Sequence, residues 1–406
     1  MQKKRVVVTG IGVVTPIGTG NKRFWEAALK GTNGIKELES IDTTDCRTKT
    51  GGEVKDFRPE DYLTESDIAS MGRSSQFAIA ASEMALNQSG LNIEKNPFRV
   101  GVSMGTTMGE PQILDKAVNM IYRDSDIDSI PSYLPSQYPC GVIPANISRK
   151  FNIKGPSTII PTACAAGNYA AGYAYDQIRL GEIDAAVVGG SDPFSGIAFT
   201  GFNRLLSTTP DICRPFDKNR KGMAVSEGAG ILILEELEHA KARGAEILAE
   251  FAGYGLGCDA FNMTIPHPQG EGGILATGKA LKNSGTDKSD VDYICAHGTG
   301  TGENDKVETL ISKEVFGDRA YNIPMTSLKS MLGHTMGAAS AIEAAACVMM
   351  INEGIILPTI NYSEKDPLCD LDYVPNQPRE AEISTAVSNA YAFAGNTSAV
   401  VLKRFS

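Results

Sequence analysis

Short runs of β-branched residues alternate with alanine-rich stretches along the whole chain, and this alternation is the strongest constraint on the fold. We predict strands at 5–8, 99–103, 157–160, 185–189, 230–234, 293–296, 382–387 and 397–403, with a second series of strands beginning at 247. We predict helices at 24–30, 75–88, 144–151, 168–180, 273–284, 305–316 and 338–351. Alternating strands and helices are typical of an α/β layered fold.

Two segments of the chain resemble each other. Residues 164–171 read CAAGNYAA and residues 334–341 read HTMGAASA, at an offset of 170 residues. Each follows an expected strand that contains Pro, Ser or Thr, and each opens an alanine-rich helix. A true repeat predicts two similar halves, joined near residues 240–250, whose important loops face each other. Because the match is short, a chance similarity is the open alternative.

Composition excludes several classes of protein. Hydrophobic residues make up 42% of the 406 residues and charged residues 21%, which allows a large core and excludes general disorder. The net charge of −10 argues against nucleic acid as the main partner. No apolar run approaches the roughly 20 residues of a membrane span, and the N-terminus does not read as a signal peptide. We therefore expect a cytoplasmic protein with reduced thiols.

Cys164 is the best candidate for a nucleophile. None of the eight cysteines forms a C-x-x-C pair, so the sequence predicts neither a zinc knuckle nor a disulfide framework. Cys164 follows an expected strand and begins an expected helix, whose free N–H groups and dipole favour a thiolate. We therefore expect a lowered pKa for this thiol. A buried structural thiol is the alternative.

Two of the four histidines lie where acid–base residues are useful. His297 follows an apolar strand, and His334 lies in the loop before the helix at 338–351. His239, on a charged helix, and His267, between two prolines, are expected to be inert. For His297 and His334 the alternative is a structural, hydrogen-bonded imidazole.

A charged pair could hold the loop that carries His334. Lys329 precedes that histidine by five residues, and Glu343 lies inside the next helix, so the two side chains could form a buried ion pair. The spacing of the candidate cysteine and histidines does not fit a compact zinc site, so no metal is predicted. The pair Gly10 and Gly12 lacks the third glycine of a dinucleotide-binding motif.

Several motifs in order carry a family resemblance over nearly the whole chain. They are VVVTGIGVVTP at 6–16, TACAAG at 162–167, RPFD at 214–217 with Gly222, EGAG at 227–230, HGTGT at 297–301 with Asn304 and Asp305, KSMLGH at 329–334 and NTS at 396–398. With them the chain resembles the elongating β-ketoacyl-acyl-carrier-protein synthases. The resemblance implies a thiolase-like α/β fold with a duplicated α/β/α/β/α five-layer architecture, its halves at 1–245 and 246–406.

The resemblance also implies a reaction and roles for individual residues. The reaction is a decarboxylative Claisen condensation of malonyl units on acyl carrier protein, without a cofactor. Cys164 would accept the acyl chain, while His297 and His334 would promote decarboxylation and stabilise the enolate. The remaining implied roles are site organisation by Lys329 and Glu343, an oxyanion hole from the N–H groups of Cys164 and Phe393, a gate at Phe393, phosphopantetheine binding by Thr299 and Thr301, and an acyl pocket shaped by Met108 and Phe202.

Three features depart from the usual fatty-acid enzyme. The gate motif, usually GFGGTN, reads AFAGNT at 392–397, and the added methyl groups should restrict its backbone. Region 65–74 lacks the family's basic cluster, and region 123–128 is acidic where bases are common. We therefore favour a ketosynthase subunit of a type II polyketide or polyene pathway. The alternatives are a housekeeping long-chain fatty-acid synthase and a non-catalytic chain-length partner, although the latter would lose the cysteine.

Partners follow from the same resemblance. An acidic carrier protein needs a local basic patch on a chain of net charge −10. The candidates are Arg149, Lys150, Arg204, Arg220 and Lys221. We further expect either a homodimer or a heterodimer with a chain-length-factor homologue. Acyl chain length and starter unit stay open.

Overall fold

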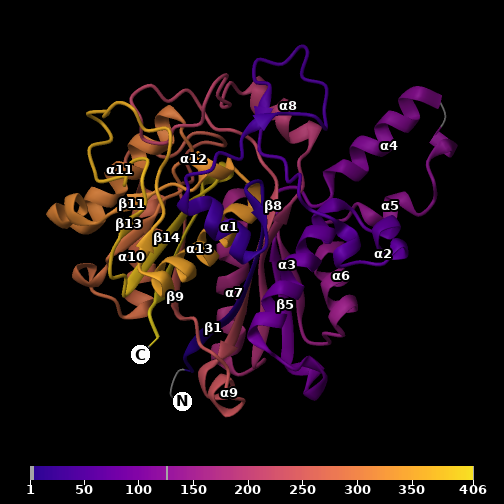
Figure 1. Ribbon diagram of the computed structural model, residues 1–406, viewed down its shortest axis with the longest axis horizontal. Coiled ribbons are helices and arrows are strands. Elements are labelled where there is room, and N and C mark those ends of the chain that lie inside the picture. The colour runs from indigo at the N-terminus through magenta and orange to yellow at the C-terminus, as the bar shows by residue number, and fades with distance from the viewer. Residues whose placement is uncertain (1–3, 125–126, 406) are drawn as a thin grey trace.

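One large sheet runs through the molecule (Figure 1), whose computed structural model describes residues 4–124 and 127–405. The strand order is β11-β10-β14-β15-β9-β1-β8-β7-β5-β6, with β2 paired to β1. The strands are β1 Val6–Thr15, β2 Gly18–Thr19, β5 Val100–Gly105, β6 Ser157–Ile160, β7 Ala185–Asp192, β8 Gly228–Glu236, β9 Ala249–Cys258, β10 Tyr293–Cys295, β11 Met325–Thr326, β14 Thr385–Tyr391 and β15 Asn396–Lys403. Two small ribbons pair β3 Lys36–Glu37 with β4 Thr50–Gly51, and β12 Ile355–Ile356 with β13 Arg379–Glu380.

The sheet consists of two similar halves. Outward from β1 the neighbours are β8, β7, β5 and β6, and outward from β9 they are β15, β14, β10 and β11. The halves meet through a short antiparallel pairing of Val7 with Glu250 and Val8 with Ala249. This confirms the predicted duplication. The boundary expected between residues 245 and 246 falls between α9 and β9 and stays a prediction.

Helices cover both faces of each half-sheet. They are α1 Asn21–Leu29, α2 Glu65–Ser70, α3 Arg73–Ser89, α4 Pro111–Asp124, α5 Leu134–Gln137, α6 Val142–Phe151, α7 Ala166–Leu180, α8 Gly196–Arg204, α9 Leu237–Ala242, α10 Glu271–Ser284, α11 Gly302–Phe316, α12 Lys329–Leu332 and α13 Ala339–Glu353. The outer layers are α3 with α6, and α10 with α11. Between the half-sheets lie α7, against β5, β7, β9 and β15, and α13, against β8 and β14. The five-layer architecture is confirmed.

Small side chains make the central layer possible. Helix α13 is buried on all sides from Ala339 to Ile351, with Glu343 as its one charged residue in that stretch. A helix that is apolar all round must be buried, as this one is.

None of the helices in the described ranges combines the length and apolar composition that a bilayer-spanning helix requires.

The expected elements are present, but β1 was predicted too short. It continues through Gly10 and Gly12 to Thr15, although the sequence predicted a strand only at 5–8. The two glycines serve packing instead. A Cβ atom at Gly10 would lie 2.1 Å from the carbonyl oxygen of Ala85 on α3. Glycine therefore marks a close approach of helix and strand, not a strand end.

The repeat is real but its register differs from the sequence match. Ala163 and Met336 are equivalent, with φ of 51° and 54°, and the helices that follow begin at Ala166 and Ala339. The structural offset is therefore 173 residues instead of 170, and Cys164 is equivalent to Gly337. Helices α4 and α8 were not predicted. The acidic segment at 123–128 lies partly outside the described residues, at 125–126.

The central helix contact predicts the effect of one added methyl group. A Cβ at Gly167 on α7 would lie 2.8 Å from the Cβ of Ala341 on α13, so Gly167→Ala should lower the free energy of unfolding by about 1–3 kcal/mol. The control is Gly278→Ala on α10, where no atom lies within 4 Å of the new Cβ. That variant should gain about 0.5–1 kcal/mol. Guanidinium denaturation measures both, and an unchanged stability of Gly167→Ala would contradict the packing.

Candidate active site

Cys164 lies in a tight turn between β6 and α7. The turn is a 3₁₀ segment, Ala163–Ala165, and Ala163 adopts a left-handed conformation that is uncommon for a residue with a Cβ. Only 6% of Cys164 is exposed. Strained backbone of this kind persists where surrounding structure enforces it, and often at functional sites.

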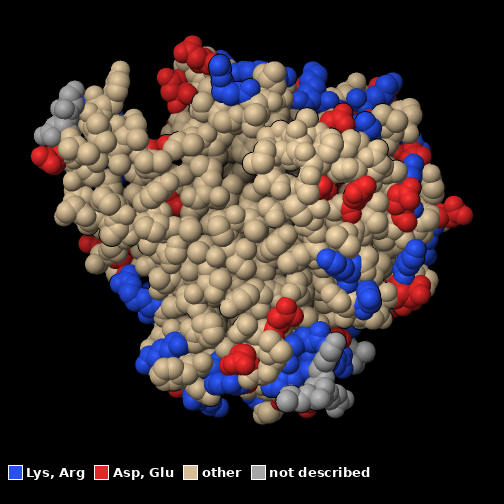
Figure 2. All heavy atoms as spheres, turned by 180° about the vertical axis from the view of Figure 1, so that it is seen from behind, with Lys and Arg blue, Asp and Glu red and all other residues tan. Residues whose placement is uncertain are grey.

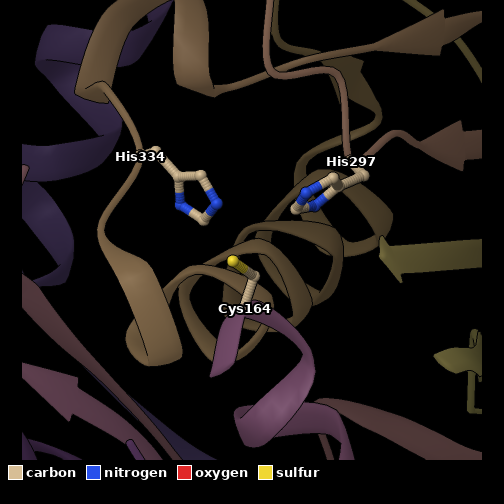
Figure 3. Close-up of side chains that lie close together, drawn as sticks. All are labelled: Cys164, His297 and His334. Atoms are coloured by element: carbon tan, nitrogen blue, oxygen red, sulfur yellow. The ribbon is translucent and has the colours of Figure 1, made fainter. Parts of the chain in front are cut away.

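The two histidines named by the sequence lie beside this cysteine. His297 follows β10, and His334 follows α12, so three distant segments supply the three side chains. The Cys164 sulfur and one ring nitrogen of each histidine all lie within 4.8 Å of one another. Figure 3 shows both rings beside the sulfur, and their centroids are 5.3 Å apart in an edge-to-face arrangement. Tertiary folding therefore assembles a Cys-His-His cluster.

Both imidazoles are neutral at pH 7. Burial lowers the pKa of each ring well below 6.5, and the nearby charge of Lys329 lowers it further. The backbone N–H of Met336 donates to Nδ1 of His334 over 3.2 Å. The neutral ring therefore carries its proton on Nε2, which has no hydrogen-bond partner among the described residues. That N–H is available to donate to a substrate oxygen.

The expected low pKa of Cys164 is wrong in direction. Burial raises the pKa of the thiol to about 12, although Lys329 and the backbone N–H groups of Cys164 and Phe393 act to lower it. Removal of the sulfur from water outweighs the helix terminus and the nearby charge. The resting residue is a thiol, so its attack on a substrate requires a neighbouring base such as a neutral imidazole.

The ion pair suggested by the sequence is present. The ammonium of Lys329 binds the carboxylate of Glu343, and both side chains are almost fully buried. Burial raises the pKa of Glu343 to about 7, and Lys329 acts against this rise. Removal of either partner would leave an unpaired charge in the core, which is strongly destabilising.

The same lysine bears on the question of a metal. In the folded chain, Cys164, His297 and His334 are close enough to share an ion, so their spacing in the sequence is not an argument against one. The positive charge of the Lys329 ammonium, however, acts on all three groups. A cation at this position would be repelled.

A cavity of about 390 Å³ reaches the Cys-His-His cluster. Thr299, Thr301, Phe202 and Phe393 are among the residues that line it. The rings of Phe202 and Phe393 are 5.5 Å apart. Met108 is not among the lining residues, and its expected role in an acyl pocket stays a prediction.

The gate segment has the restricted backbone that its sequence suggested. Ala394 adopts φ of +62°, a conformation that favours glycine and costs an L-residue about 1–2 kcal/mol. The N–H of Ala394 donates to the carbonyl of Met263, and the N–H of Asp259 donates to that of Gly395, each over 2.8 Å. The gate segment is thus hydrogen-bonded to the loop at 259–263.

Buried carboxylates at the site were missed at the sequence level. Asp192, at the end of β7, accepts hydrogen bonds from Thr106, Thr107 and Gly337, and so joins β5 to the turn after His334. Burial raises its pKa to about 6. The sequence signal that could have identified it is an acidic residue at the end of an apolar strand.

The five expected docking residues do not form one patch. Arg149 pairs with Asp67 and the ammonium of Lys150 donates to the carbonyl of Tyr62, so both lie beside α2. Lys221 lines the cavity and pairs with Asp211. Exposed Arg204 makes no hydrogen bond or ion pair within the described chain.

Arg220 is not a docking residue as expected, whereas further basic residues lie near Arg204. The Arg220 side chain is only 6% exposed and pairs with Asp305 and Asp366, so it is not a surface docking charge. Exposed Arg47 and Lys49 flank Thr48, whose N–H donates to Asn203, the neighbour of Arg204. The sequence could not place these basic residues together, because they lie more than 150 positions apart.

The comparisons with known proteins cover the chain almost completely. Residues 3–240 match the family described as beta-ketoacyl synthase, N-terminal domain, and residues 248–363 match its C-terminal domain. The chain is 40% identical to 3-oxoacyl-[acyl-carrier-protein] synthase 2 of Synechocystis sp., covering 100% of this chain and 99% of the relative. It is 39% identical to nodulation protein E of Rhizobium meliloti, covering 99% of each.

Solved structures show the same architecture. The ishigamide ketosynthase/chain length factor is 40% identical, with a TM-score of 0.96 and full coverage of both chains. The complex AntDE:AntF, a type II PKS acyl-carrier protein with its ketosynthase, contains a chain that is 34% identical, with a TM-score of 0.93 and full coverage of both chains.

The raised pKa of Cys164 predicts how its reactivity depends on pH. Because the thiolate fraction stays small, alkylation of Cys164 by iodoacetamide should accelerate about tenfold per pH unit from about pH 7 to 9, without levelling off. Mass spectrometry of the Cys164 peptide measures the rate, and exposed Cys258 in the same sample reports the reagent. A plateau within this range would show a low-pKa thiolate instead.

Proposed function

This chain belongs to the β-ketoacyl synthase family, and on that basis we propose that it is the ketosynthase subunit of a type II polyketide or polyene pathway. The chain is a condensing enzyme of the acyltransferase type. The proposal on its pathway is supported by the similarity to the ishigamide ketosynthase/chain length factor and by the alanine-containing gate. The single observation that carries the mechanism is the Cys-His-His cluster within 4.8 Å.

The first step is acyl transfer to Cys164. The sulfur attacks the carbonyl carbon of an acyl thioester while a neutral imidazole accepts the thiol proton. The backbone N–H groups of Cys164 and Phe393 both reach the sulfur, so they are placed to stabilise an oxyanion on the attacked carbonyl. The carrier's thiol leaves with the proton, and the acyl chain stays on the enzyme as a thioester.

The second step is decarboxylation of a malonyl thioester. Loss of CO2 leaves its electron pair on the adjacent carbon, so the step needs neither a strong base nor a cofactor. The negative charge spreads to the thioester oxygen, where Nε2–H of His334 and the ring of His297 donate. Neutral imidazoles suit this role, since their lowered pKa values keep them uncharged.

Condensation completes the cycle. The carbanion attacks the acyl carbonyl on Cys164, a carbon–carbon bond forms, and the cysteine sulfur leaves as a thiolate that takes up a proton from water. Lys329 and Glu343 hold the loop of His334 by their buried ion pair. The hydroxyl groups of Thr299 and Thr301 lie 2.9 Å apart in the cavity, and we assign to them the phosphopantetheine arm of the carrier.

A second subunit is part of the proposal. The arm formed by α4 and α5 projects from the body (Figure 1) and exposes the apolar residues Leu114, Val118, Ile121, Tyr122 and Tyr133. Figure 2 shows few charged side chains in the middle of the opposite face. Exposed apolar surface such as that of the arm marks a contact with another protein. We propose that a chain-length-factor homologue, or else a second copy, covers the arm.

Carrier protein is proposed to dock beside the cavity. Arg204, at the end of α8, adjoins Leu205 and Leu206, which line the cavity. Arg204, Arg47, Lys49 and Lys221 would attract an acidic carrier. We further propose that the protein acts in the cytoplasm on carrier-bound substrates without a cofactor of its own.

A housekeeping fatty-acid synthase is the second candidate. It is favoured by the 40% and 39% identities to 3-oxoacyl-[acyl-carrier-protein] synthase 2 of Synechocystis sp. and of Staphylococcus aureus strain COL. A non-catalytic chain-length partner is disfavoured because Cys164, His297 and His334 are all present and assembled.

Two variants test the assigned chemistry. Cys164→Ala should reduce condensation by several orders of magnitude, because the covalent nucleophile is lost, while the fold is kept. His334→Ala should still accept an acyl group on Cys164 but should release little CO2 from malonyl carrier protein. Acyl labelling and CO2 release measure the two half-reactions separately. Retained CO2 release with lost acylation would reverse the assignment.

Co-expression tests the pathway. We expect the chain to be soluble and active chiefly when it is produced with a chain-length-factor homologue, because that partner covers the apolar arm. Size-exclusion chromatography and a condensation assay compare the chain alone with the co-expressed pair. An active homodimer that elongates long-chain acyl carriers would establish the housekeeping alternative.

A further inference from the structure

Side chains from other segments bind the backbone N–H and carbonyl groups of the loop from His297 to Gly302. It carries one imidazole of the cluster and both cavity threonines. The two carboxylate oxygens of Glu308 accept the N–H groups of His297 and Gly298, each over 2.7 Å. Asp305 accepts the N–H of Gly300 over 3.2 Å. Two carboxylates from the first turns of α11 thus accept hydrogen bonds from the backbone N–H groups of the loop.

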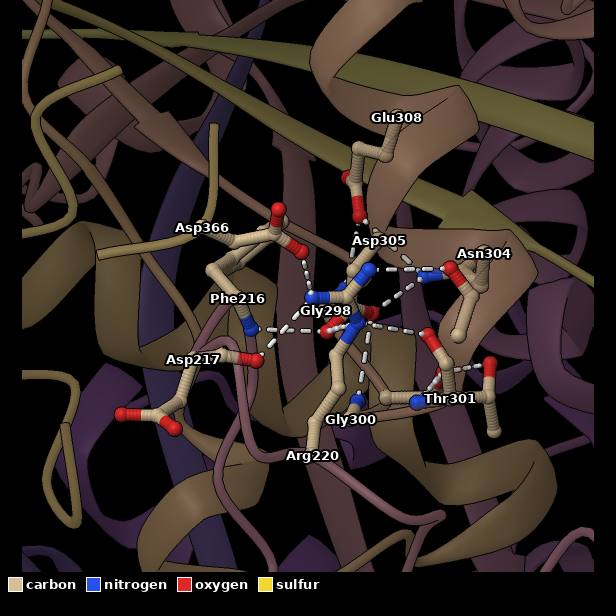
Figure 4. A network of polar contacts seen from close by, with 12 residues as sticks. Phe216, Asp217, Arg220, Gly298, Gly300, Thr301, Asn304, Asp305, Glu308 and Asp366 are labelled. Carbon is tan, nitrogen blue, oxygen red and sulfur yellow. Dashed lines mark hydrogen bonds and ion pairs between the residues drawn. The ribbon is translucent and has the colours of Figure 1, made fainter. Parts of the chain in front are cut away.

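Arg220 holds the loop's carbonyl groups from the other side. Its Nε donates to the carbonyl of Thr301 over 3.3 Å, and its Nη2 donates to the carbonyl of Gly302 over 3.1 Å. The neighbouring Gly222 donates its N–H to the carbonyl of Gly300 over 2.9 Å. Figure 4 shows the guanidinium among these groups. Arg220 therefore contacts the loop directly at the threonine that faces the cavity.

Two carboxylates balance and orient the guanidinium. Nε of Arg220 lies 3.8 Å from an oxygen of Asp305, and Nη1 donates to Asp366. Burial opposes the charge of Arg220, but the two carboxylates outweigh burial and raise its pKa. Asp305 also accepts the N–H of Phe216 over 2.7 Å, at a residue with φ of +62°. The network links the segment around Arg220 to α11.

We propose that Arg220 is a positioning residue for the phosphopantetheine site: it holds the Thr299–Gly302 backbone so that both threonine hydroxyls face the pantetheine arm. The proposal rests on the proposed function. A planar guanidinium is required because its fork reaches two carboxylates and three carbonyls at once, the third carbonyl being that of Asp217. A lysine keeps the charge but offers a single nitrogen.

The test separates the planar geometry of the Arg220 guanidinium from its positive charge. Arg220→Lys keeps the charge balance with Asp305 and Asp366 but loses the fork, and Arg220→Gln loses both. The control is Arg58→Gln, which removes an exposed arginine that pairs with Asp61 away from the cavity. Each variant is assayed for KM and kcat with malonyl-pantetheine and with malonyl carrier protein. Pantetheine binding is measured independently by protection of Cys164 from iodoacetamide.

We expect Arg220→Lys to raise KM about tenfold for both substrates and to weaken pantetheine protection by a similar factor. Its thermal midpoint should fall, because buried carbonyls lose their donors, but its alkylation rate without pantetheine should stay near that of the wild type, which a general disturbance of the site would not allow. Arg220→Gln should also lower the midpoint, and Arg58→Gln should change none of these quantities. If Arg220→Gln does not fold, Arg220→Lys still decides the question.

Two results would overturn the role of Arg220. One is wild-type KM and protection in Arg220→Lys, and the other is a rise in KM for carrier protein alone, which would make Arg220 a docking residue. A wild-type chain that binds pantetheine without condensing would refute the proposed function and leave the protection assay to judge Arg220. Absence of protection in the wild type would refute both.

Discussion

The close approach of α7 and α13 between the half-sheets is the constraint on which the site depends. Cys164 precedes one helix and His334 precedes the other, so their packing sets the distance between sulfur and imidazole. The contact requires glycine at position 167, because a Cβ there would lie only 2.8 Å from the Cβ of Ala341. Asp192 then fixes the turn after His334 through the N–H of Gly337. Chemistry at this site is a consequence of backbone packing more than of any single hydrogen bond.

Buried charge is the second constraint, and the two buried cations Lys329 and Arg220 each bind carboxylates. Lys329 binds Glu343 on one side of the cluster, and Arg220 binds Asp305 and Asp366 on the other. Burial, reinforced by the charge of Lys329, keeps the imidazoles neutral, and burial also keeps Cys164 protonated. The resting site thus contains a protonated thiol and no thiolate. It holds a thiol beside two neutral imidazoles, and substrate must enter before the proton moves.

Much of the fold could be predicted from local pattern, and the errors have local causes. The strand at 157–160 was placed correctly, because β-branched runs and alanine-rich helices are written into contiguous sequence. The strand expected at 5–8 continues to Thr15 through Gly10 and Gly12, because helix α3 packs closely against these glycines. The repeat was found by its glycines, yet the backbone equivalence pairs Ala163 with Met336. Sequence similarity and backbone geometry need not share a register when the turn residues differ.

The sequence by itself determined the family, the duplicated fold and the identity of the cluster, because motifs such as HGTGT and KSMLGH occupy contiguous positions. Tertiary structure alone decided the state of each group. The pKa of Cys164 rises although a helix begins beside it, because burial by distant segments outweighs the local dipole. Arg220 looks like a surface charge in KNRKG, but Asp366, 146 positions away, draws it inside. Burial and long-range pairing depend on what the whole chain brings near a residue, and local sequence does not contain that information.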